Sequence, residues 1–133
     1  MLKNSKLAKL SFDESIFCSK YLDLWALVNN AGIIEYGGLE WGSPGVEHYA
    51  KQMDVNALGV VRVTKSFLPL IRDRSNDSAR VVIVASCASR ATMNGMVGYS
   101  MSKFAVRAFA DGLRRELRKW NKHVAVIEPF VYG

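Results

Sequence analysis

The chain has 133 residues, of which 50% are hydrophobic and 23% are charged, and its formal net charge is +6. This balance excludes a disordered chain and suffices for one domain with a core. No apolar run approaches the roughly 18 residues of a membrane span, and Cys18 and Cys87 are too few for a metal site or a disulfide framework. No signal peptide is apparent, so the default expectation is an intracellular, cytoplasmic protein.

Three short apolar runs, at residues 25–29, 80–85 and 123–128, are predicted to be strands. Their nearly continuous apolarity is typical of strands buried on both faces of a parallel sheet. Two segments between them, at about 45–71 and about 99–121, carry apolar residues at helical spacing. The chain therefore reads strand, helix, strand, helix, strand.

This order is a βαβαβ unit of a doubly wound α/β fold. Ser43 followed by Pro44 suits the start of the first helix. Because crossover connections are right-handed, both helices should lie on one face of the sheet if the strand order advances in one direction. Only residues 1–24 remain to cover the second face, and residues 11–22 can form at most one short helix. We therefore expect that the chain pairs with another molecule or is part of a longer product.

Much of the basic charge lies along the predicted helices, as in "LRRELRKW" at residues 113–120. Its spacing is typical of an amphipathic helix with a charged outer face. A nucleic-acid surface is the alternative, but no zinc-finger, RNP or helix-turn-helix pattern supports it. We therefore expect no nucleic-acid partner.

Polar and small residues follow each predicted strand, at the edge where open α/β sheets bind ligands. These are "NNAG" at 29–32, Ser86, and Glu128 with Pro129. The second helix carries Tyr99 and Lys103, four residues apart and therefore on one face. An ammonium favours the phenolate form of a neighbouring tyrosine, and a serine hydroxyl can hold a substrate oxygen beside it. Such a pair also occurs by chance on helix surfaces, but its combination with Ser86 and "NNAG" favours proton transfer.

Asn56 has two interpretations, and so do the two loop aromatics Tyr36 and Trp41. Asn56 lies inside the first predicted helix, either at a solvated position or at a distortion that frees a carbonyl to hold a water. Tyr36 and Trp41 lie in a glycine-rich loop, where they either line a substrate pocket or pin the loop. Cys87 is expected to be structural, because no histidine partner is apparent.

Five segments carry a family resemblance: "LWALVNNAG" (24–32), "MDVNALGVVRVTKSFLPLIR" (53–72), "RVVIVAS" (80–86), "YSMSKFAVRAFADGLRRELRKW" (99–120) and "VAVIEP" (124–129). Together they resemble the short-chain dehydrogenase/reductase superfamily, within it the branch of retinol, 17β-hydroxysteroid and 3-hydroxybutyrate dehydrogenases. The resemblance implies a partial Rossmann-type parallel sheet in residues 24–133, after a variable segment at 1–23. It also implies NAD or NADP as cofactor, an alcohol or ketone as substrate, and a location that includes the endoplasmic reticulum or mitochondrion.

The resemblance implies a role for each matching residue. Tyr99 would be the acid/base, Lys103 would bind the nicotinamide ribose and favour the phenolate, Ser86 would orient the substrate oxygen, and Asn56 would hold a proton-relay water. The cofactor side would consist of Asn29, Ala31, Gly32, Tyr99, Lys103 and Pro129. The two long helices would form a homodimer or heterodimer.

Two departures from the family pattern are visible. The threonine-glycine-x-x-x-glycine-x-glycine turn that cradles pyrophosphate is absent from these 133 residues, and Phe130 follows Pro129 where the family usually has glycine. We therefore carry two hypotheses. The first is an NAD(P)-dependent oxidoreductase acting on a lipid-like alcohol or ketone, such as a steroid, a retinoid or a hydroxy acid. The second is an inactive fragment that keeps the dimer helices and binds a full-length relative.

Overall fold

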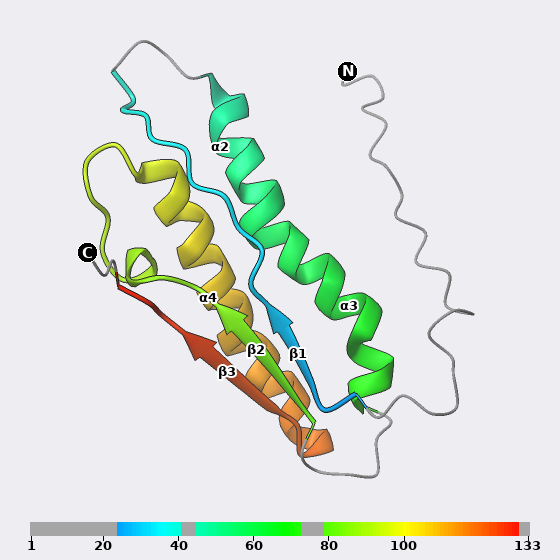
Figure 1. Cartoon of the computed structure of the whole chain (residues 1–133). Helices are drawn as coiled ribbons and strands as arrows, with labels where there is room; N and C mark the ends of the chain where they lie inside the picture. The colour runs from blue at the N-terminus through cyan, green and yellow to red at the C-terminus, as the bar shows by residue number, and fades with distance from the viewer. Residues whose placement is uncertain (1–23, 41–44, 73–78, 131–133) are drawn as a thin grey trace, which may run out of the picture.

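The computed structural model describes residues 24–40, 45–72 and 79–130 (Figure 1). The expected helix at 11–22, the Ser43–Pro44 helix start, Cys18 and Trp41 lie outside the described residues. The elements are β1 (Ala26–Asn29), α2 (Val46–Met53), the π-helical turn η1 (Asp54–Leu58), α3 (Gly59–Arg72), β2 (Arg80–Val84), the 3₁₀ turn η2 (Cys87–Ser89), α4 (Val97–Leu117), the 3₁₀ turn η3 (Arg118–Trp120) and β3 (His123–Ile127). The three predicted strands and two predicted long helices are confirmed, the first helix with a π-helical interruption.

The strands form one parallel sheet in the order β1-β2-β3. In its register Asn29 lies opposite Ile83, and Val84 lies opposite Ile127, so all three strands end at nearly the same level. The predicted α/β fold with a βαβαβ order is confirmed. The carboxyl ends of the three strands form one edge of the sheet, and several predicted site residues lie along this edge.

Both long helices pack on the same face of the sheet, as the right-handed crossovers require (Figure 1). The core between the two layers contains, among others, Ile71, Val81, Ile83, Val106 and Leu117, each at most 1% exposed. This arrangement confirms the expected placement of the helices.

Within the described residues the strands are buried on one face only. Burial alternates along β1 and β2, and Val28 and Ile127 on the uncovered side are 58% and 50% exposed. The cause is the topology, which puts α3 and α4 on the other face. The continuous apolar runs therefore leave an apolar second face that nothing in the described part of the chain covers.

The charged outer face predicted for the second helix is confirmed. Leu113 and Leu117 are buried, while Arg114, Arg115 and Arg118 are exposed. No helix among the residues that the structure describes is long and apolar enough to cross a membrane.

Candidate active site

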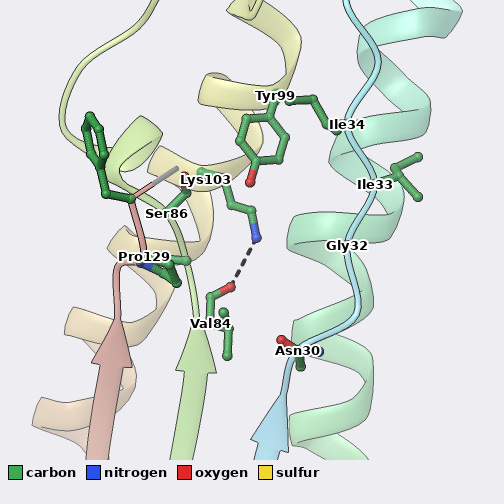
Figure 2. Close-up of a pocket in the computed structure, with 11 residues that line it drawn as sticks. Asn30, Gly32, Ile33, Ile34, Val84, Ser86, Tyr99, Lys103 and Pro129 are labelled. Carbon is green, nitrogen blue, oxygen red and sulfur yellow. Dashed lines mark hydrogen bonds between the residues drawn. The ribbon is translucent and has the colours of Figure 1, made fainter. Parts of the chain in front are cut away.

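A cavity of about 310 Å³ opens at the carboxyl edge of the sheet (Figure 2). Four parts of the chain line it: the segment after β1, the end of β2, the first turns of α4 and the segment after β3. The lining residues are Asn30, Gly32, Ile33, Ile34, Val84, Ala85, Ser86, Tyr99, Lys103, Pro129 and Phe130. The predicted hydroxyl, phenol and ammonium are thus brought to one cavity.

Lys103 and Tyr99 are not a solvated pair on a helix surface. Lys103 is only 4% exposed, and its Nζ donates to the Val84 carbonyl oxygen at 3.1 Å. The same Nζ lies 5.6 Å from the centre of the Tyr99 ring, and the Tyr99 hydroxyl points into the cavity (Figure 2). Burial lowers the pKa of Lys103, because desolvation disfavours its charged form. An ammonium has three N–H donors, so the bond to Val84 leaves two for other partners.

Ser86 stands directly after β2 and both lines the cavity and holds the following turn. Its Oγ accepts a hydrogen bond from the Ala88 backbone N–H at 3.1 Å, and its Oγ lies 3.9 Å from the Cys87 sulfur. The Cys87 backbone N–H donates to the Pro129 carbonyl oxygen at 2.9 Å. This bond brings the segment after β3 alongside Ser86.

Asn56 lies in the π-helical turn and is 1% exposed, so the predicted distortion is confirmed and the solvated interpretation is wrong. Its Oδ1 accepts from the Ile33 N–H at 2.7 Å, and its Nδ2 donates to the Ile33 carbonyl at 2.8 Å and to Ser102 Oγ at 2.9 Å. Ser102 Oγ donates in turn to the Tyr99 carbonyl at 2.6 Å. Asn56 thus joins the segment after β1 to the turn of α4 that carries Tyr99.

Gly32 lies close to the Lys103 ammonium. A Cβ at this position would lie 3.5 Å from Lys103 Nζ and 3.3 Å from Asn56 Oδ1. Such a Cβ would be tight against Asn56 Oδ1 and in ordinary contact with Lys103 Nζ, so glycine leaves more room beside both groups.

Two predicted cofactor residues and one loop aromatic lie outside the cavity lining. Asn29 is 6% exposed, and its Nδ2 donates to Thr64 Oγ1 at 3.0 Å, which fastens the end of β1 to α3. Ala31 is exposed beyond the lining, and Tyr36 is 71% exposed. The support that Thr64 and Ser102 supply was not predicted. Ser102 carries a local signal, because a residue three positions after Tyr99 lies on the same helix face.

Glu128, which directly follows β3, links the segment after β3 to neighbouring parts of the site. Its carboxylate accepts from Ser89 Oγ at 2.5 Å and from Arg90 Nε at 2.8 Å, and it lies 3.5 Å from Arg107 Nε. The hydrogen bonds from Arg90 and Ser89 hold the pKa of Glu128 below its usual value. This cluster fastens the end of β3 to the turn after Ser86 and to α4.

Comparison with known proteins identifies the class. Solved structures with the same fold include a short-chain dehydrogenase from Streptomyces avermitilis (TM-score 0.72, 28% identity, 81% of this chain and 39% of that one). Another, from Burkholderia cenocepacia J2315, was solved in complex with NADP (TM-score 0.71, 25% identity, 79% of this chain and 43% of that one). The family model of the short chain dehydrogenases matches residues 16–132, and the chain belongs to this family.

The curated relatives are dehydrogenases of small molecules. Retinol dehydrogenase 7 of Mus musculus is 45% identical over 106 residues, and 17-beta-hydroxysteroid dehydrogenase type 6 of Bos taurus is 45% identical over 107 residues; each match covers 80% of this chain and 32% of the relative. The mitochondrial D-beta-hydroxybutyrate dehydrogenase of Bos taurus is 44% identical over 106 residues, which are 80% of this chain and 29% of the relative. The chain therefore spans about a third of the length of these relatives.

The residues present fit the nicotinamide and ribose end of NAD(P). The buried Lys103 ammonium has N–H donors beyond the one that Val84 accepts, and Gly32 leaves room beside it. Ribose hydroxyls are suitable acceptors for such donors. Gly32, Lys103 and Pro129 are the lining residues that would hold this end.

The Glu128 cluster yields a test of stability against pH. Glu128→Gln should lower the melting temperature at pH 7 by roughly 5 °C, because a neutral amide loses the charge-assisted bonds to Arg90. The folded-state pKa is depressed, so this stabilisation is present above the unfolded-state pKa of about 4.3 and is lost as the pH falls through the folded-state pKa. Circular dichroism melts of the two proteins should therefore converge on acidification.

The control is Glu116→Gln, which removes an exposed carboxylate on α4 that is not part of the Glu128 cluster. It should leave the melting temperature nearly unchanged at pH 7. A Glu128→Gln deficit that stays constant from pH 7 to pH 3 would contradict the assigned role of the carboxylate.

Proposed function

We propose that this site belongs to an NAD(P)-dependent oxidoreductase that interconverts an alcohol with a ketone or aldehyde. The observation that carries the proposal is the buried Lys103 ammonium beside the Tyr99 hydroxyl, in a cavity that Ser86 also lines. Membership of the short chain dehydrogenase family supports it.

In the proposed oxidation, Ser86 holds the substrate oxygen and the Tyr99 phenolate takes the hydroxyl proton. The Lys103 ammonium lies beside the Tyr99 ring and places a positive charge near the site of proton transfer. The O–H and C–H bonds of the alcohol break as its C=O bond forms, the proton passing to Tyr99. The hydride acceptor in this direction, and the hydride donor in reduction, would be NAD(P), and this is the chemistry that the cofactor would supply when bound. In reduction Tyr99 returns the proton to the developing alkoxide.

Asn56 is proposed to support the proton-transfer trio of Ser86, Tyr99 and Lys103 without being a member of it. Both ends of its side-chain amide are engaged by Ile33 and Ser102, so a relay water would bind the backbone of the π-helical turn. Turns of this kind are frequent at functional sites. Asn29, through its bond to Thr64, and Ala31 are proposed to shape the cofactor side of the loop after β1.

The proposed substrates are lipid-like alcohols or ketones. Ile34 and Phe130 give the cavity apolar surface beside Ser86, Tyr99 and Lys103. The relatives' names refer to retinol, to a 17-beta-hydroxysteroid and to D-beta-hydroxybutyrate. A retinoid, a steroid or a hydroxy acid is therefore the first class to assay.

Tyr99→Phe tests the proposed acid/base directly. Turnover should fall by about 10²- to 10⁴-fold, because the phenolic proton site is lost while the ring remains. Turnover is measured as the change in nicotinamide absorbance with retinol, a 17-hydroxysteroid and 3-hydroxybutyrate. Tyr36→Phe is the matched control, since Tyr36 is exposed outside the cavity. An unchanged rate in Tyr99→Phe would refute the assignment.

A second function is favoured by apolar residues on the outer surface of the long helices. Val97, Met101 and Phe104 follow one stripe of α4 and are 40%, 50% and 44% exposed, and Val63 of α3 is 42% exposed. Exposed apolar patches mark interaction surfaces. The alternative is a non-catalytic chain that binds a full-length relative through these helices.

Phe104→Glu tests this alternative, because a buried charge in the interface is costly. Co-purification with a full-length retinol or hydroxysteroid dehydrogenase should fall by at least tenfold, whereas Trp25→Glu, which changes an exposed aromatic residue beside the sheet, should leave it unchanged. Recovery of no dehydrogenase by the unchanged chain would count against the alternative.

A further inference from the structure

A second buried amide lies one helical turn before Asn56 and repeats its bonding pattern. Gln52 of α2 is 0% exposed. Its Oε1 accepts from the Glu35 N–H at 3.1 Å, and its Nε2 donates to the Glu35 carbonyl at 3.3 Å. Asn56 does the same to Ile33. Two amides at positions i and i+4 therefore hold alternate residues of the segment after β1, much as a neighbouring strand would.

We propose that Gln52 is a positioning residue which, together with Asn56, fixes Ile34 as the apolar wall that faces Tyr99 across the substrate cavity. This inference rests on the proposed function, since the cavity is the one assigned to the alcohol or ketone. Gln52 has no part in the proton transfer described above. Its contribution would be to substrate shape.

The alternation of an extended segment explains why Ile34 is the residue affected. The backbone groups of residues 33 and 35 bond to the two amides, and because successive side chains of an extended segment alternate, the Ile34 side chain lies on the face opposite to those of Ile33 and Glu35. In Figure 2 Ile34 extends towards Tyr99, whereas Ile33 points away from it. A slip by one residue would exchange these two faces. With both amides in place, neither residue 33 nor residue 35 is free to slip.

The orientation of the Gln52 amide is set by its own neighbours. Gln52 Nε2 lies 3.3 Å from His48 Nε2, and His48 Nδ1 lies 3.3 Å from Glu35 Oε2. With the proton on Nδ1, His48 donates to Glu35 and accepts from Gln52, so each donor meets an acceptor. Lys51 also pairs with the Glu35 carboxylate. These contacts hold Glu35 and the amide in register.

Gln52 also lies against Gly98, the residue before Tyr99 in α4. A Cβ at Gly98 would lie 2.7 Å from Gln52 Nε2 and 3.2 Å from Tyr49 Cδ1. Gln52 therefore packs against the backbone just before Tyr99 while it holds the backbone just after Ile34. One side chain thus sets the spacing between the two residues that face each other in the cavity.

The test is Gln52→Met, which removes both hydrogen bonds and keeps a similar volume. In methyl-labelled protein, cross-relaxation between the Ile34 methyl groups and the Tyr99 ring should weaken at least fivefold. Thr64→Val is the matched control. It also removes a buried hydrogen bond on the first long helix, but that bond holds Asn29 and not Glu35. It should leave the Ile34–Tyr99 contact unchanged. If Gln52→Met does not fold, Gln52→Asn, whose amide is one methylene shorter, is expected to give the same loss.

A kinetic measurement separates this inference from the proposed function. Gln52→Met should raise KM for a long apolar alcohol about tenfold and change kcat by less than threefold, because the hydrogen bonds that it removes end on Glu35, while a methionine of similar volume keeps the packing against Gly98. An Ile34–Tyr99 contact that persists in Gln52→Met overturns the inference whether or not the chain turns over substrate. Absence of turnover in the unchanged chain counts against the proposed function alone, and the magnetic resonance result then decides the role of Gln52.

Discussion

The side-chain amide of Asn56 is the interaction on which the site depends. It lies in a π-helical turn and joins the segment after β1 to the first turns of α4 through Ile33 and Ser102. A buried amide left without partners is costly, so these bonds fix the two walls of the cavity relative to each other. A backbone hydrogen bond from the Gly37 N–H to the Gly95 carbonyl, at 2.9 Å, joins the same segment to the residues just before α4.

The parallel sheet supplies the rest of the geometry. Its strands end at one level, so Ser86 and the segment after β3 reach the same edge, where Glu128 fastens them together through Ser89 and Arg90. Helix α4 then returns across this edge and buries the Lys103 ammonium against the Val84 carbonyl. Burying an ammonium is unfavourable for folding, and such groups concentrate at functional sites. The fold thus holds a charge where the proposed reaction needs one.

Local patterns in the sequence predicted the elements and the trio of Ser86, Tyr99 and Lys103, because strand ends and the i, i+4 spacing depend only on neighbouring residues. The apolar strands indicated a second face in need of cover, but local patterns do not say what covers it, since that depends on residues or molecules elsewhere. Gln52 and Thr64 were missed because their partners, Glu35 and Asn29, lie 17 and 35 residues away along the chain. The distortion at the π-helical turn was predicted, because an asparagine inside a helix indicates one. The partners of its amide were not, because the residue type does not say what it binds.

The most direct test of the account is a fluorescence titration of NADH and NADPH into the unchanged chain and into Lys103→Met. The central claim is that the buried ammonium forms the nicotinamide end of a cofactor site. The account predicts saturable binding of at least one cofactor, weakened at least tenfold in Lys103→Met. That variant should remain folded, because it replaces a buried charge with an apolar side chain of similar length. A folded chain that shows no saturable binding, or binds equally well without the ammonium, would contradict the claim.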